Sequence, residues 1–187
     1  MTQTEYAGDV CSHKHAFALD NFIRKVFQNP KKIVGEYIKA GDTVIDLGCG
    51  PGFFTIDMAG MVGDTGHVIA VDLQKEMMEK VDKKAKAKGV HHIITRHRCP
   101  ADGIDLDENS IADFILAFYM VHETPDQERF LEQVKQLLKP DGRFLLVEPL
   151  FHVSKKKFQR TENIAQKVGF TIINRPRKKG GRSLLLQ

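Results

Sequence analysis

Two hydrophobic patterns alternate along the chain. Short runs of consecutive apolar residues, rich in β-branched side chains, are typical of strands that are buried on both faces. Such runs predict strands at 43–48, 67–72, 91–98, 113–119 and 143–149, followed by a terminal pair at 170–177 and 182–187. Apolar residues spaced three or four apart predict helices at about 53–61, 74–88, 124–138 and 156–169, and two more within 16–40.

Cap and turn residues support several of these boundaries. Asn29-Pro30 is typical of an N-cap followed by the first helical residue of the second N-terminal helix. Gly89 stands where a left-handed residue ends a helix at low cost. Thr124, with Gln127 three residues later, predicts a capping box that opens the helix over 124–138.

Strands that alternate with helices of this length indicate an α/β fold with a doubly wound, mostly parallel sheet of the Rossmann-like type. The link between the last two strands, 178–181, is too short for a crossover helix. These two strands must therefore run antiparallel, which puts one reversed strand into a seven-stranded sheet. We expect a single domain over 1–187, with a loose arm at 1–15 and the N-terminal helices at 16–40.

The loop after the first predicted strand holds the clearest chemical signal. Gly48, Gly50 and Gly52 alternate there, which lets the backbone turn tightly and come close to a ligand. Asp72 ends the second strand, at the edge where ligands bind in open α/β sheets, and its carboxylate can accept both hydroxyls of a ribose.

A dinucleotide site is the first alternative, but its third glycine would fall at Phe53. Asp46, at the end of the first strand, would also repel a pyrophosphate and attract an ammonium or sulfonium group instead. No G-x-x-x-x-G-K-[ST] sequence is present, which excludes a P-loop nucleotidase.

Three segments together resemble the class I S-adenosylmethionine-dependent methyltransferases: VIDLGCGPGFFT, VIAVDLQKEMM and LKPDGRFLLVEP. The chain is most similar to the small single-domain branch near the quinone-biosynthesis and arsenite methyltransferases, over roughly residues 30–187. The resemblance implies S-adenosyl-L-methionine as cofactor. It implies the following residues for the cofactor site: Asp46, Gly48, Cys49, Gly50, Gly52, Asp72, Leu73, Met77, Ala101, Asp102, Ala117 and Phe118.

Within that set, the three glycines line the methionine part, Asp72 holds the ribose, and Leu73 and Met77 pack on adenine. The family often has an Asp after the third strand that receives the adenine amino group. Pro100 stands at that position here, so either Asp102 takes over or backbone groups alone bind the base.

Four polar side chains follow the fourth and fifth strands, where the methyl acceptor is expected. They are His122, Glu123, Glu148 and His152. An imidazole beside a carboxylate suits a general base, and two His with two Glu also suit a metal. The alternative is that His122 and Glu123 only cap their loop. No close ligand spacing supports a metal, so we expect none.

Composition and charge set limits on function. With 42% hydrophobic and 28% charged residues, the chain is typical of an ordinary globular protein. It has no run of eighteen apolar residues, and its polar start, MTQTEYAGDV, lacks the features of a secretory signal. We therefore expect no membrane span or membrane partner and a cytoplasmic location, where Cys11, Cys49 and Cys99 are free thiols.

Charge is unevenly distributed. Residues 150–187 hold ten Lys or Arg against Glu162 alone, a net +9, so the first 149 residues sum to −5. A basic end of this kind is either a solvated surface or a site for polyanions. In the arm, Cys11, His13 and His15 are candidates for binding a soft metal or covering the site.

We therefore predict an S-adenosylmethionine-dependent methyltransferase that acts on a small-molecule acceptor by in-line displacement. Two alternatives stay open: an RNA or protein methyltransferase that uses the basic C-terminal region, and a non-catalytic cofactor-binding subunit. The Asn/Asp-Pro-Pro-Tyr signature of the amino-group nucleic-acid methylases is absent, which counts against DNA adenine and cytosine-N4 chemistry.

Overall fold

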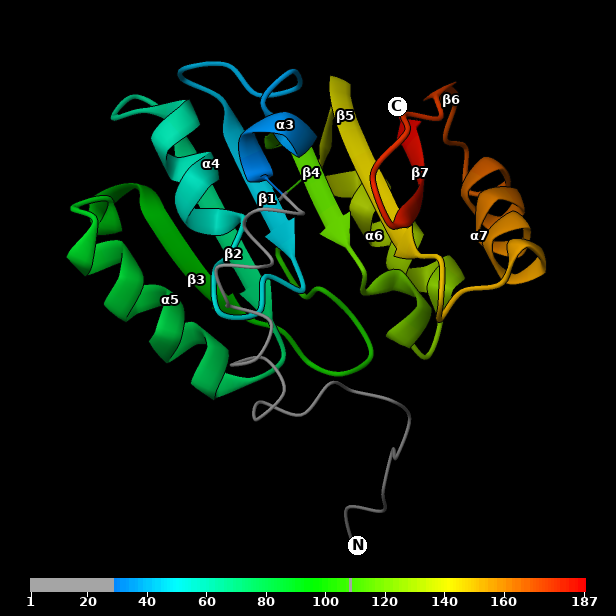
Figure 1. Cartoon of the computed structure of the whole chain (residues 1–187), viewed down its shortest axis with the longest axis horizontal. Helices are drawn as coiled ribbons and strands as arrows, with labels where there is room; N and C mark the ends of the chain where they lie inside the picture. The colour runs from blue at the N-terminus through cyan, green and yellow to red at the C-terminus, as the bar shows by residue number, and fades with distance from the viewer. Residues whose placement is uncertain (1–28, 108) are drawn as a thin grey trace, which may run out of the picture.

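A computed structural model describes residues 29–107 and 109–187. These residues form one seven-stranded sheet in the order β3-β2-β1-β4-β5-β7-β6 (Figure 1). The expected arm and the first N-terminal helix lie outside the described residues, so the boundaries given for them stay predictions, as does the single domain over 1–187.

The strands are β1 (Thr43–Leu47), β2 (His67–Asp72), β3 (Ile94–Arg98), β4 (Ala112–Phe118), β5 (Leu138–Pro149), β6 (Ile172–Asn174) and β7 (Gly181–Leu186). The helices are α3 (Pro30–Val34), α4 (Thr55–Val62), α5 (Lys75–Ala87), α6 (Gln127–Leu137) and α7 (Lys155–Lys167). Two short 3-10 helices are η1 (His91–Ile93) and η2 (Val121–Glu123). None of the helices in the described part of the chain is long and apolar enough to cross a bilayer.

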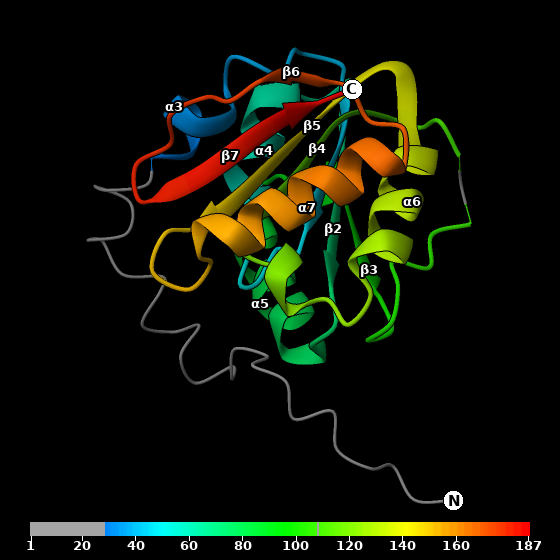
Figure 2. The same ribbon diagram turned by 90° about the vertical axis from the view of Figure 1, so that its right-hand side faces the viewer.

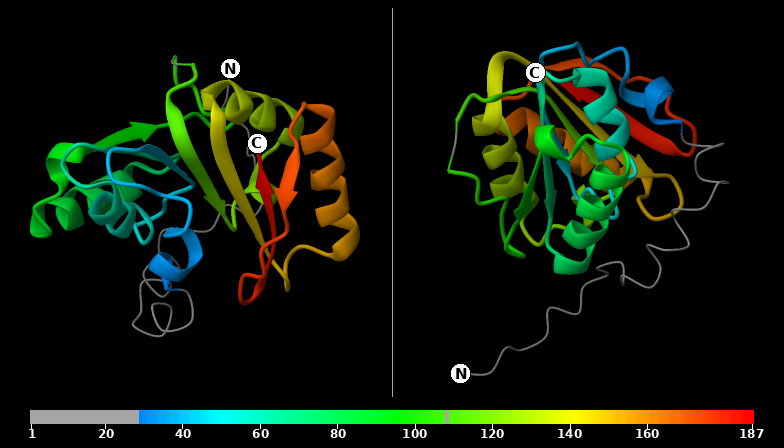
Figure 3. Two further views of the ribbon diagram at one scale, coloured as in Figure 1. Left: turned by 90° about the horizontal axis from the view of Figure 1, so that it is seen from above. Right: turned by 90° about the vertical axis from the view of Figure 1, so that its left-hand side faces the viewer.

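The sheet lies between two layers of helices. On one face of the sheet, α3, α4 and α5 pack against the strands and form one hydrophobic core. On the other face, α6 and α7 pack against the strands and form a second core. Helix α7 faces the viewer in Figure 2, whereas α4 and α5 do so in the right panel of Figure 3. Burial on both faces explains why β1, β2 and β4 read as continuous apolar runs.

Five strands pair in parallel, and the C-terminal hairpin supplies the reversed strand. β7 is antiparallel to both β5 and β6, and it lies between them. The expected α/β class, the seven strands and the antiparallel strand in the C-terminal hairpin are thus confirmed.

The observed N-cap of helix α6 differs from the predicted one. The N-cap is Asp126, not Thr124, because the Asp126 carboxylate accepts hydrogen bonds from the backbone N–H groups of Glu128 and Arg129, both at 3.0 Å. The Thr124 hydroxyl instead donates to the Val121 carbonyl at 2.8 Å, which closes the preceding turn. Asp126 has the extended backbone that an N-cap requires, and its short side chain reaches two free donors.

Three other boundaries also differ from the prediction. α3 ends at Val34 rather than near Lys39, and the start of the third expected strand forms η1. β5 begins at Leu138, before the predicted Lys139–Gly142 turn, with an irregular register opposite the start of β4. The Asn29 cap is confirmed, since its side chain accepts from the Lys32 N–H.

The N-cap of α6 gives a stability prediction. Asp126→Ala removes the acceptor of two backbone N–H groups and should lower the free energy of unfolding by about 1 kcal/mol, whereas Asp126→Asn should stay within about 0.5 kcal/mol of the wild type. Urea unfolding of both variants and of Thr124→Ala measures this. A larger loss in Thr124→Ala than in Asp126→Ala would contradict the assignment.

Candidate active site at the carboxyl ends of the strands

The parallel pairing of β1 with β2 and β4 brings three loops to one edge of the sheet. The glycine loop follows β1, Asp72 ends β2, and η2 follows β4. β5 pairs in parallel with β4, so the residues after Val147 reach the same edge. Ligands of open α/β sheets bind at this edge, where the strand order reverses.

The glycine loop is shaped by three left-handed residues. Gly48, Gly50 and Gly52 have φ values of 64°, 52° and 80°. A Cβ at position 48 would lie 2.8 Å from the Met120 side chain, so this glycine is required by packing. A Cβ at position 50 would meet nothing within 4 Å, so the loop is open there to an approaching ligand.

Two buried carboxylates hold this loop. Asp46 is 2% exposed and accepts a hydrogen bond from the Thr55 hydroxyl at 2.6 Å. Asp72 accepts from the backbone N–H of Gly50 through one oxygen and from that of Gln74 through the other, both at 2.9 Å. Burial raises the pKa of Asp72, and these hydrogen bonds oppose the shift. A carboxylate oxygen can accept more than one hydrogen bond, so Asp72 keeps capacity for ligand hydroxyls.

The other residues expected at the cofactor lie at different depths. Ala117 and Phe118 are buried at the end of β4, and Met77 is 1% exposed within the core that α5 forms with the sheet. Leu73 is half-buried, whereas Ala101 and Asp102 are exposed. Asp102 accepts a hydrogen bond from Arg129 at 3.1 Å.

The two described cysteines are free thiols with raised pKa values. Burial raises the pKa of Cys99 to about 11 and raises that of Cys49 well above its usual value. A thiolate is the form that attacks electrophiles and binds soft metals. Cys49 and Cys99 are therefore poor nucleophiles, and Cys11, His13 and His15 lie outside the described residues.

The buried carboxylate of Glu148 binds the imidazole of His122, which follows β4. Glu148 is 1% exposed, and its carboxylate accepts from the His122 backbone N–H at 3.0 Å and lies 2.5 Å from the ring Nδ1. The hydrogen bond to Glu148 raises the pKa of His122, and burial opposes it in part. With Nδ1 on Glu148, the ring nitrogen of His122 that faces away from this acid is Nε2.

The two other expected acceptor-site residues lie close by. The Glu123 carboxylate is 4.0 Å from His122 Nε2. The His152 ring lies parallel to the His122 ring, with centroids 6.4 Å apart. The structure thus brings all four residues together, although no group of three or more His, Cys, Asp or Glu among residues 29–107 and 109–187 has the arrangement of a metal site.

Sequence reasoning missed Tyr119. Its φ is 63°, which is unusual for a bulky side chain, and its N–H donates to the Val147 carbonyl at 2.8 Å. The ring packs against the hairpin tip, where a Cβ on Gly180 or Gly181 would lie 3.3 or 3.2 Å away. The Gly180-Gly181 pair was the available signal, but its sequence also fits an ordinary hairpin link.

The fold and the site define an α/β protein with a glycine loop and an acid–imidazole pair at the same edge of its parallel strands. A family model described as a methyltransferase domain matches residues 38–177. The chain therefore belongs to the methyltransferase domain family, whose cofactor is S-adenosylmethionine. The family and cofactor that the sequence predicted are confirmed.

Two curated relatives are similar to this chain in sequence. The chain is 32% identical over 111 residues to the demethylmenaquinone methyltransferase of Lactobacillus johnsonii (59% of this chain, 45% of the relative). It is 28% identical over 141 residues to the ubiquinone/menaquinone biosynthesis C-methyltransferase UbiE of Haemophilus ducreyi (73% and 54%). The chain thus spans about half the length of these curated relatives.

The fold is shared with a crystal structure of a SAM-dependent methyltransferase from Aquifex aeolicus. That structure has a TM-score of 0.82 and 24% identity, and the match covers 94% of this chain and 97% of the other.

The glycine loop fits the cofactor. It is open at Gly50, a carboxylate with spare acceptor capacity lies beside it, and Asp46 adds negative charge below it. When bound, S-adenosylmethionine supplies a methyl group on a positively charged sulfonium, which buried acids attract.

A pair of glycine variants separates ligand binding from packing. Gly50→Ala adds a Cβ into open space, so it should lower the free energy of unfolding by only about 1 kcal/mol, the cost of the left-handed conformation. The same Cβ obstructs the ligand and should weaken S-adenosylmethionine binding by more than about 1.4 kcal/mol, or tenfold. Calorimetry and urea unfolding measure the two quantities.

Gly48→Ala is the matched control, because its Cβ collides with Met120 and should cost roughly 1–3 kcal/mol more in stability. Wild-type cofactor affinity in Gly50→Ala would show that the ligand does not approach the loop at this residue.

The His122–Glu148 pair predicts a dependence of stability on pH. Because folding raises the pKa of His122 above its ordinary 6.5, the pair stabilises the fold fully below pH 6.5 and loses this contribution as the pH rises through the raised pKa. The difference in unfolding free energy between the wild type and His122→Gln should therefore shrink with rising pH. A difference that grows over this range contradicts the ion pair.

Proposed function

We propose that this chain is a methyltransferase that transfers the sulfonium methyl of S-adenosylmethionine to a small-molecule acceptor, with His122 as general base. The observation that carries the proposal is the position of the His122–Glu148 pair. It stands at the ends of β4 and β5, on the same edge as the glycine loop.

Glu148 supports this role in two ways. Its two hydrogen bonds fix the backbone and the ring of His122, so Nε2 is the nitrogen left to face an acceptor. The buried carboxylate also stabilises the imidazolium that forms when His122 takes a proton. Removing an acceptor proton raises the nucleophilicity of the atom that attacks the methyl group, and in-line displacement then needs mainly alignment.

The names of the relatives favour a quinone-type acceptor. The Haemophilus ducreyi protein is a ubiquinone/menaquinone biosynthesis C-methyltransferase, and the Lactobacillus johnsonii protein is a demethylmenaquinone methyltransferase. Methylation at carbon of a phenol-like ring begins with loss of the hydroxyl proton, which suits a histidine base. The acceptor proposed here is therefore a ring with an acidic hydroxyl.

Three further observations concern the alternative acceptors and the cellular location of the protein. Burial of Cys49, and the lack of any group of three or more His, Cys, Asp or Glu suited to a metal in the described ranges, disfavour an arsenite acceptor, which needs several accessible thiols close together. For an RNA or protein substrate, the Lys178 side chain is not available, since it donates to the Ile33 carbonyl at 2.8 Å and pairs with Glu36. Free thiols agree with the proposed cytoplasmic location.

Turnover and cofactor affinity of two variants test the role of the pair. His122→Ala and Glu148→Gln should lower kcat by roughly 10²-fold or more, the usual size of a general-base contribution, and leave the Kd for S-adenosylmethionine within about threefold. The demethylated quinol serves as the acceptor. Losses of cofactor affinity and stability with unchanged kcat would mean that the pair only braces the glycine loop.

The pH profile sharpens the test. The activity of the wild type should rise with pH through the raised pKa of His122, because only the neutral ring accepts a proton. A weakly active Glu148→Gln enzyme should reach its plateau at lower pH, since the carboxylate that raises this pKa is gone. Glu123→Gln, 4.0 Å away, is the control and should shift the profile less.

A further inference from the structure

The loop after β5 exposes two apolar side chains beside the proposed acceptor site. Phe151 is 95% exposed and Leu150 is 42% exposed. They follow Glu148 by three and two positions, so they lie at the same edge of the sheet. Adjacent exposed apolar side chains rimmed by polar residues are typical of surfaces that bind a protein or a membrane.

Helix α7 begins directly after this loop with an unusual charge pattern. Lys155, Lys156, Lys157 and Arg160 are exposed, and the first turn holds no acidic residue. Cations near a helix N-terminus are unfavourable, because the helix dipole places positive charge there. None of these four side chains takes part in the ion pairs found in the described ranges. The Ser154 hydroxyl caps the helix by accepting from the Lys157 N–H at 3.2 Å, but it adds no negative charge. The charge pattern thus lowers the stability of the helix.

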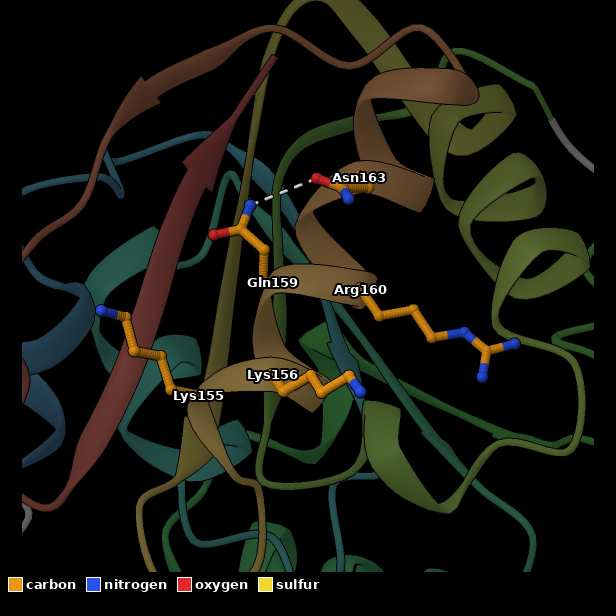
Figure 4. Close-up of a pocket in the computed structure, with 5 residues that line it drawn as sticks. All are labelled: Lys155, Lys156, Gln159, Arg160 and Asn163. Carbon is orange, nitrogen blue, oxygen red and sulfur yellow. Dashed lines mark hydrogen bonds between the residues drawn. The ribbon is translucent and has the colours of Figure 1, made fainter.

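The basic side chains spread over a surface rather than surround one point. In Figure 4, Lys155 extends to one side of α7, whereas Lys156 and Arg160 extend to the other. Between them the helix bears a shallow hollow, with Gln159 hydrogen-bonded to Asn163. This arrangement does not enclose a single small anion, but it suits an extended anionic surface.

The same surface is connected to the catalytic edge. The Leu150 N–H donates to the Gly180 carbonyl at 3.1 Å, so this loop and the β6–β7 hairpin tip lie side by side. The Thr161 hydroxyl of α7 donates to the Gln127 side chain at 3.0 Å, and Gln127 donates to the Val121 carbonyl at 3.2 Å. Helix α7 is thus linked to η2, which holds His122.

We propose that Leu150, Phe151, Lys155, Lys156 and Arg160 form a patch that docks on the surface of an anionic lipid bilayer. The two apolar side chains enter the boundary between headgroups and acyl chains, and the cations bind lipid phosphates. The exposed Phe151 ring suits base stacking as well as lipid, whereas the aliphatic Leu150 beside it suits only lipid, and the pair therefore favours lipid over RNA. The expectation of no membrane partner rested on the lack of an apolar span, and surface docking needs none.

Docking would place the entrance of the acceptor site against the bilayer. An apolar acceptor dissolved in lipid then reaches His122 without crossing water. This consequence rests on the proposed function, but the docking itself does not, because it is measured as binding without any methyl transfer.

Flotation of the full chain with vesicles tests the proposal. The chain should bind vesicles that contain phosphatidylglycerol and phosphatidylcholine, bind phosphatidylcholine alone much more weakly, and dissociate as salt rises. Each basic residue contributes roughly fivefold to such partitioning, so Lys155→Gln with Lys156→Gln should lower it by about 25-fold. Phe151→Ser should lower it by about tenfold.

Matched controls are available on other elements. Lys83→Gln with Lys88→Gln removes two exposed charges from the α5 region, and Ile173→Ser removes an apolar side chain that is 46% exposed on β6. Both should bind vesicles like the wild type, and circular dichroism of every variant checks folding. Equal binding to both vesicle types, or equal losses in the controls, would overturn the proposal. A third outcome would also overturn it: the chain does not bind vesicles but binds an RNA oligonucleotide in a salt-dependent way, and Lys155→Gln with Lys156→Gln abolishes this RNA binding.

Discussion

The parallel pairing of β1 with its two neighbours places every group of the proposed site. Because β2 and β4 run in the same direction as β1, the glycine loop, Asp72 and His122 all follow strand ends at one edge. Glu148 joins them because β5 continues the parallel order. Slipping one of these strands by a single residue would move each of its side chains to the opposite face of the sheet and disturb the packing of both cores, so the apolar runs that build the cores also fix the site.

Buried carboxylates give this edge its chemistry. Asp72 connects the glycine loop to the start of α5 through two backbone N–H groups, and Glu148 connects the ends of β4 and β5 through His122. Each acid is buried and is satisfied by hydrogen bonds. Together with Asp46, they favour a cationic cofactor at one end and an imidazolium at the other.

Much of the fold and of the candidate site could be predicted from the sequence, because continuous apolar runs and alternating glycines each have one common structural explanation. The strands, the reversed strand at the C-terminus and the pairing of residues around His122 follow from such patterns. The cap of α6 did not, since Thr124 and Asp126 are both good caps and only the path of the loop selects between them. The left-handed Tyr119 and the full exposure of Phe151 also depend on tertiary packing, which local patterns do not encode.

The central claim is that one edge of the sheet holds both the cofactor and the acid–imidazole pair. A crystal structure of the chain with S-adenosylhomocysteine tests it most directly. The account predicts the ribose hydroxyls on Asp72, the amino acid part over the glycine loop at Gly50, and the sulfur on the side of the loop that faces His122. Binding elsewhere on the chain, or a sulfur that faces away from His122, would contradict it.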